Sequence, residues 1–179
     1  MVKQSLPLLV VCGLGGIVAG STLGAMIPIL EDIKGLIVVI PAVIALRGNI
    51  STALGSRLGS AYHLGIIDAD NLWNVELKQN ILGSLLLSLI MSFIIGVLAY
   101  GTSLLLHVQP DPLLLIAIVV VAGILSSLIL ILLTIIIIYL VFKRGYDPDN
   151  ITGPALATFG DVISMLCLFG SALLIGGIT

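Results

Sequence analysis

Five long apolar stretches divide the chain, and the short segments between them hold most of its charged residues. Each stretch has about 20 residues or more, the length that an α-helix needs to cross the roughly 30 Å hydrocarbon core of a bilayer. The stretches run over about residues 6–26, 35–62, 81–106, 113–142 and 152–178. Turn-forming segments separate the last three, HVQPDP before the fourth stretch and KRGYDPDN before the fifth. The pattern therefore predicts an all-α membrane protein with five transmembrane helices.

The composition excludes an ordinary water-soluble domain. Hydrophobic residues make up 59% of the chain and charged residues 9%, whereas soluble domains are about half apolar and about a quarter charged. Seven Lys and Arg residues against nine Asp and Glu residues give a net charge of −2. The chain therefore has no basic surface that could follow a nucleic-acid backbone. We expect a multi-pass protein of the cell membrane, surrounded by the lipid bilayer.

The basic residues predict the orientation of the helices. Five of them fall at one set of helix ends, namely Lys3, Arg57, Lys78, Lys143 and Arg144. Lys34 alone falls at the other set, so the N-terminus is expected in the cytoplasm and the C-terminus outside. Arg47 and Arg57 lie within the second stretch, and we expect them to extend to the membrane surface or to pair with loop carboxylates.

Small residues predict which helices pack together. Gly, Pro and charged residues concentrate in the first, second and fifth stretches, which we expect to form the inner layer of the bundle. The third and fourth stretches are almost entirely Leu, Ile and Val and are expected to face lipid. Glycines at positions 13, 16, 20 and 24 repeat at helical spacing, which favours a packed spanning helix over a cleaved signal peptide. The pairs Gly20–Gly24 and Gly55–Gly59 have the GxxxG spacing of close helix packing.

Asp161 is an acid deep inside the fifth predicted span. About ten residues of the span precede it, so its carboxylate is expected near the bilayer midplane, where an uncompensated charge is costly and marks a functional residue. Pro154 leaves the carbonyl of Asn150 without its helical partner, and Gly153 and Gly160 loosen the same segment. Free carbonyl oxygens beside a carboxylate suit a hard cation. The alternative is a neutral carboxyl group hydrogen-bonded to a neighbouring Ser or Thr.

The second span carries a matching polar face. Pro41 leaves a carbonyl one turn earlier without its partner. Asn49, Thr52 and Ser56 follow at positions i, i+3 and i+7 and so share one helix face. This face suits contact with water, and Pro41, Thr52, Ser56 and Pro154 are the candidate pore-lining residues. The alternative is hydrogen bonding between helices alone.

The candidate oxygen ligands limit which kinds of metal ion the site would bind. Carboxylate, carboxamide and carbonyl oxygens favour Mg²⁺, Ca²⁺ or Mn²⁺ over softer metals. Mg²⁺ keeps several of its waters and is typically held by one or two carboxylates. One Asp161 in each chain of a two-fold pair supplies two carboxylates to one divalent ion. We therefore expect a homodimer with a shared axial pore.

Two segments resemble a known family. The second-span segment IPAVIALRGNISTALGSRLGSAYHLG resembles the signature helix of the MgtE-type integral membrane domain, especially as written in the related two-repeat solute-carrier magnesium transporters. The fifth-span segment DPDNITGPALATFGDVISML is similar to the last helix of the same domain, with its DP turn, Pro, Ala-Thr and buried Asp. The resemblance covers essentially the whole chain, and the number of spans agrees with it.

The resemblance implies a transporter or channel for a divalent cation, with Mg²⁺ as the transported ion, and not an enzyme. It matches Asp161 to the pore aspartate and Ala157 to a backbone carbonyl contact. It matches Gly48 and Asn49 to the pore-facing part of the second helix, and Thr158 is included as a candidate metal contact. The implied ion pathway lies between the second and fifth helices of a homodimer. In the alternative, a sister subunit and not a second copy supplies the other half of the pore.

We expect the chain to depart from the family pattern in two respects. It is expected to hold one repeat, unlike the fused eukaryotic carriers, so that another copy or a sister subunit supplies the second half of the pore. It starts a few residues before its first predicted span, so we expect residues 1–179 to form a single membrane domain without cytoplasmic magnesium-sensing or CBS domains. Two other functions stay open. An intramembrane aspartyl protease would use Asp147 in YD and Asp161 in FGD as its two acids. A non-transporting scaffold would use a protonated Asp161 for helix packing.

Overall fold

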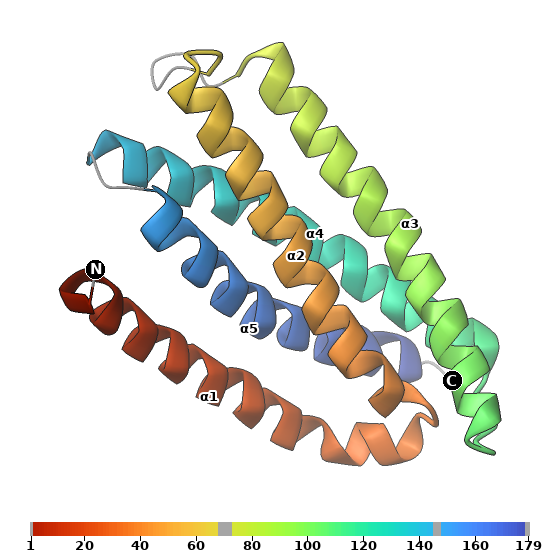
Figure 1. Ribbon diagram of the computed structural model, residues 1–179. Coiled ribbons are helices and arrows are strands. Elements are labelled where there is room, and N and C mark those ends of the chain that lie inside the picture. Colours follow the sequence, from red (N-terminus) through yellow and green to blue (C-terminus); the bar gives the residue numbers. More distant parts are fainter. Residues whose placement is uncertain (1, 68–72, 145–147, 178–179) are drawn as a thin grey trace.

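The computed structural model describes residues 2–67, 73–144 and 148–177, and this part of the chain forms five long helices (Figure 1). They are α1 (Val2–Asp32), α2 (Leu36–His63), α3 (Val75–Leu105), α4 (Pro112–Lys143) and α5 (Pro148–Gly176). All five are long and apolar enough to cross a membrane, which confirms the predicted all-α architecture. Successive helices run in opposite directions, so α1 begins and α5 ends at opposite ends of the bundle (Figure 1). Which end faces the cytoplasm stays a prediction.

The helix boundaries differ most from the predicted spans at the start of α3, which begins at Val75 and not near residue 81, and at the end of α1. We expected the first span to end before Pro28, but α1 continues through this proline to Asp32. A proline removes one hydrogen bond of the helical ladder, and an otherwise regular apolar helix can tolerate that loss. The chain reverses at Gly35, whose φ of 82° lies in the left-handed region. A side chain at this position would also meet Ser103 Oγ at 2.7 Å, so the turn packs directly against the end of α3.

Helix α5 lies between α1 on one side and α2 and α4 on the other. In the most apolar part of α4, 50% of the residues are buried within the chain, against 11% in α1. The expected inner layer is therefore wrong for the single chain, since α4 is an inner helix and α1 an outer one. The reason is a row of small residues on α4, including Ser126, Ser127 and Thr134, which lets neighbouring helices approach. Each hydroxyl donates to a carbonyl of its own helix one turn earlier, so its burial leaves no unpaired group.

The glycines of α1 also differ from the expectation. Nothing lies within 4 Å of a Cβ atom built at any of the four regularly spaced positions, Gly13, Gly16, Gly20 and Gly24. Gly15 makes the close contact of this helix instead, against Thr158 of α5. In α2, Gly55 packs closely against Leu156 of α5, whereas Gly59 has open space. Within one chain, the predicted packing role is therefore wrong for the four glycines of α1 and right for Gly55.

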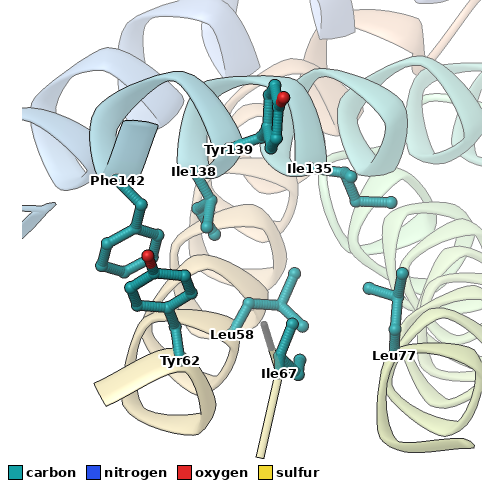
Figure 2. Close-up of a pocket in the computed structure, with 8 residues that line it drawn as sticks. All are labelled: Leu58, Tyr62, Ile67, Leu77, Ile135, Ile138, Tyr139 and Phe142. Atoms are coloured by element: carbon teal, nitrogen blue, oxygen red, sulfur yellow. The ribbon is translucent and has the colours of Figure 1, made fainter. Parts of the chain in front are cut away.

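The hydrophobic core forms two clusters. The first lies toward the α1–α2 turn and includes Leu36, Val43 and Ile118. The second lies toward the other end of α2 and consists of Leu54, Leu58, Ala61, Ile67, Leu77, Ile131 and Ile138. A pocket of about 20 Å³ lies at this second cluster, and the rings of Tyr62 and Phe142 stack there with centroids 3.7 Å apart. Figure 2 shows the residues that line it. Its lining is apolar and holds none of the candidate site residues, so this pocket is part of the helix packing.

Candidate ion site

Two glycines bring α2 and α5 into backbone contact. A Cβ atom added at Gly160 would lie 3.3 Å from the Cα atom of Gly48 and 3.4 Å from its nitrogen. Glycine at both positions therefore permits this close crossing. Asn49 and Asp161 are the next residues along the two helices, so they lie at the same level of the bundle. The structure thus brings the backbone of Gly48 against that of Gly160, with Asn49 and Asp161 each one residue along from this crossing.

Asp161 occupies the middle of α5. It lies 13 residues after Pro148 and 15 residues before Gly176, which at about 1.5 Å per residue places it roughly 20 Å from each end of the helix. Its side chain is half-buried, and Asn49 is exposed. Among the residues that the structure describes, none forms a hydrogen bond or an ion pair with the side chain of either residue. The alternative in which a neighbouring Ser or Thr holds a neutral Asp161 therefore finds no partner in this part of the chain.

One face of α2 is exposed along much of its length. Pro41, Asn49 and Ser56 are exposed and Thr52 is half-buried. The Thr52 hydroxyl donates to the carbonyl oxygen of Gly48 at 2.9 Å. The predicted polar face is thus present, and it points away from the other helices of the same chain.

Ser56 belongs to an open hollow at the end of α2. The hollow has a volume of about 430 Å³ and is lined by Ser56, Arg57, Ser60, Ala61, Leu64, Ile66, Glu76 and Asn80. Asn80 donates a hydrogen bond of 3.0 Å to the Glu76 carboxylate. The hollow therefore combines an acidic and a basic side chain at the end of the exposed face of α2.

The remaining candidates on α5 divide between two sides of the helix. Ala157 lies one turn before Asp161 and is half-buried. Thr158 instead packs against Gly15 of α1, and its hydroxyl donates to the carbonyl oxygen of Pro154 at 3.0 Å. Thr158 also lines a largely apolar groove of about 350 Å³ between α1 and α5. The structure thus places Ala157 with Asp161, whereas Thr158 and the Pro154 carbonyl belong to the contact with α1.

Arg47 is the residue that the sequence interpretation placed wrongly. It is 1% exposed, so it does not reach the membrane surface, and it pairs with no carboxylate among the described residues. Its Nη1 atom donates to Ser127 of α4 at 2.5 Å, and its Nη2 atom donates to Ser92 of α3. Gly123 leaves the space for this, because a Cβ atom there would lie 2.5 Å from Nη2. The sequence does contain a signal for this buried site. It consists of two serines one turn apart in α3 and of Gly123 with its neighbouring serines in α4.

The described part of the chain contains no group of three or more His, Cys, Asp or Glu side chains placed to hold a metal ion. Helix α2 has no acidic residue and α5 has one away from its ends, so an ion at the α2–α5 crossing would meet the Asp161 carboxylate of each chain. Neutral oxygens, from the Asn49 carboxamide and from backbone carbonyls, complete the available set. This set suits a hydrated hard cation, which needs few carboxylates.

Five apolar helices, an exposed polar face on α2 and a carboxylate in the middle of α5 without a partner among the described residues define a multi-pass membrane protein with an ionisable group in a membrane-length helix. The MgtE family model, described as a divalent cation transporter, matches residues 40–171, and the chain belongs to this family. The match includes α2 to α4 almost completely and α5 as far as its last turn.

Relatives agree with the family match. The chain is 28% identical over 178 residues to solute carrier family 41 member 2 of Gallus gallus and, equally, of Homo sapiens. It is 31% identical over 175 residues to solute carrier family 41 member 3 of Rattus norvegicus. These alignments cover 94%, 94% and 93% of the chain but 30%, 30% and 37% of the relatives. The chain therefore spans about a third of the length of the curated relatives that it matches.

The family consists of transporters and not of enzymes, which confirms the prediction that the chain is not an enzyme. This finding argues against the intramembrane protease. That alternative also needed Asp147, which lies outside the described residues.

Proposed function

We propose that the chain conducts a divalent cation, Mg²⁺, along the exposed face of α2 and α5, with the Asp161 carboxylate binding the ion or its hydration shell. The observation that carries this proposal is the position of Asp161, in the middle of a membrane helix and without a partner among the described residues. An ionised side chain there is costly unless a cation or water compensates it. Membership in a family of divalent cation transporters supports the same function.

The oxygen ligands support Mg²⁺ as the ion. Asp161, the Asn49 carboxamide and the Ala157 carbonyl are hard donors, and the family resemblance matches these positions to the pore. Mg²⁺ gives up its waters reluctantly, so one or two carboxylates and several neutral oxygens suffice for it. We propose that Gly48 and Gly160 keep this set together by holding the two helices in contact.

The exposed face of α2 supports a pore that is shared with a second copy. Asn49, Thr52 and Ser56 would be unfavourable against lipid tails, which offer no hydrogen bonds. The face must therefore meet water or protein. A second copy related by a two-fold axis would cover it, enclose the water and add a second Asp161. The four open glycines of α1 offer a further surface where another chain could approach closely.

Ion uptake by liposomes tests the function. The purified chain is reconstituted, and uptake of Mg²⁺, Ca²⁺, Mn²⁺, Co²⁺ and Na⁺ is compared. We expect Mg²⁺ uptake that is lost in Asp161→Ala and retained in Asp32→Ala, since Asp32 is exposed at the end of α1 and away from the crossing. Wild-type uptake by the Asp161→Ala variant would overturn the proposal, and uptake of Na⁺ alone would overturn the choice of ion.

Thiol crosslinking tests the dimer. Cys12 and Cys167 are first replaced by Ala, and one cysteine is then introduced as Ala53→Cys on the exposed face of α2 or as Leu86→Cys on the exposed face of α3. A short bifunctional thiol reagent is expected to link two chains through Ala53→Cys only. Linkage through Leu86→Cys alone, or through neither cysteine, would contradict a dimer built around α2.

A further inference from the structure

Arg47 forms the centre of a polar layer inside the bundle. In α2 it lies between Val43 of the first hydrophobic cluster and Leu54 of the second. Its guanidinium group holds α2 to α3 through Ser92 and to α4 through Ser127. No described carboxylate lies within ion-pair distance of it. Its hydrogen-bond acceptors among the described residues are therefore hydroxyl groups, those of Ser92 and Ser127, and the stability of the buried charge depends on how completely its donors are satisfied.

A small cavity adjoins this layer between α2, α3 and α4. Its lining residues are Arg47, Ile50, Ser51, Leu54, Ser88, Ser127, Leu130 and Ile131. The cavity has a volume of about 10 Å³, which is close to the minimum for one water molecule. Two of the lining groups, Nε of Arg47 and Oγ of Ser88, are buried and have no hydrogen-bond partner among the described residues. Both residues are 1% exposed.

The polar groups around the cavity match the bonding capacity of water. Arg47 Nε–H and the Ser88 hydroxyl are the two free donors. The hydroxyls of Ser51 and Ser127 already donate to carbonyl oxygens, at 2.9 Å and 2.7 Å, and each keeps a lone pair that can accept. Water can accept from the first two groups and donate to the second two. A halide ion would meet the lone pairs of Ser51 and Ser127 unfavourably, and a metal ion would be repelled by Arg47.

We propose that this cavity is a binding site for one structural water molecule that bridges Arg47 Nε and Ser88 Oγ. The water completes the hydrogen bonding of a charge buried within the membrane-spanning bundle. It thereby belongs to the junction that fixes α2 against α3 and α4, independently of any transported ion.

The sign of a stability change tests the proposal. If Ser88 is unbonded, Ser88→Ala removes a buried hydroxyl without a partner and should raise the unfolding midpoint of the full chain in nanodiscs. If Ser88 holds the water, the same change should lower the midpoint. Ser126→Ala is the matched control, because Ser126 is equally buried but bonds only to its own helix and does not line the cavity. We expect a larger fall for Ser88→Ala than for Ser126→Ala, and an equal fall or a rise would overturn the proposal.

A structure at a resolution that shows ordered water tests it directly. We expect one density peak about 2.7–3.2 Å from both Arg47 Nε and Ser88 Oγ in the wild-type chain. The same peak should be absent in Ser88→Val, whose methyl groups cannot bond to water and extend into the cavity. Crystals grown with bromide in place of chloride distinguish a water molecule from a halide ion at this peak, because bromide gives an anomalous signal. The absence of a peak in the wild type, or an anomalous bromide signal at its position, would overturn the water site.

Discussion

Enlarging Gly160 is expected to stop ion transport by pushing α2 away from α5. A Cβ atom at this position would lie 3.3 Å from the Cα atom of Gly48, whereas carbon atoms pack best at about 3.5–4.0 Å. Gly160→Ala therefore needs a separation of only about 0.5 Å. Its overpacking cost of about 1–3 kcal/mol is partly offset by a gain of about 1 kcal/mol, because alanine favours the helix over glycine.

Larger residues cannot be accommodated in this way. The atoms opposite Gly160 belong to the backbone of α2 and cannot rotate aside as a side chain would. Gly160→Val and Gly160→Leu should therefore separate the two helices further and displace Asn49 from Asp161. We expect Mg²⁺ uptake in liposomes to fall in the order Gly, Ala, Val, Leu.

The matched control is the same series at Gly170, which lies on α5 but has nothing within 4 Å of an added Cβ atom. The Gly170 variants should retain most of their uptake, and Gly160→Ala should remain folded by its thermal midpoint. Full uptake by Gly160→Leu would refute the α2–α5 pathway. An equal loss in both series would show that the effect does not depend on the crossing.

Two further changes test the packing around the site. Gly123→Ala places a Cβ atom 2.5 Å from Arg47 Nη2 and should lower the thermal midpoint by several degrees. Gly101→Ala is the control, because Gly101 has open space around it, and this change should leave the midpoint unaltered. Equal midpoints for the two variants would contradict the Arg47 junction. The stacked rings of Tyr62 and Phe142 should show a coupling of about 1 kcal/mol in a double-mutant cycle with leucine, measured by denaturant unfolding. A coupling near zero would show that the stack adds nothing beyond burial.

The number of helices could be predicted from the sequence, and candidate site residues could be selected from it, because both rest on local signals. Five apolar stretches of membrane-spanning length gave the five helices. Polar and small residues within an apolar stretch can be recognised from a single sequence. Asn49, Asp161 and the glycines are such residues. The crossing of Gly48 with Gly160 agrees with that interpretation, although neither position indicates the 3.3 Å approach by itself.

The arrangement of the helices could not be predicted because lipid and protein core are both apolar. Leu and Ile on α4 look alike whether they face α5 or lipid tails, so the periodicity that separates core from surface in a soluble helix is weak here. The partners of Arg47 were hidden for a related reason. They are neutral serines on two other helices, Ser92 and Ser127, rather than the acids with which an arginine is usually matched.

The charge of Asp161 is the central claim, and Mg²⁺ uptake by liposomes containing Asp161→Asn tests it most directly. Asparagine keeps the shape of the side chain and removes its negative charge, so the fold and the α2–α5 crossing should persist. If the carboxylate binds the ion, uptake falls to the level of empty liposomes while the thermal midpoint stays near that of the wild type. Uptake at the wild-type rate would show that the ion crosses without this charge and would contradict the account.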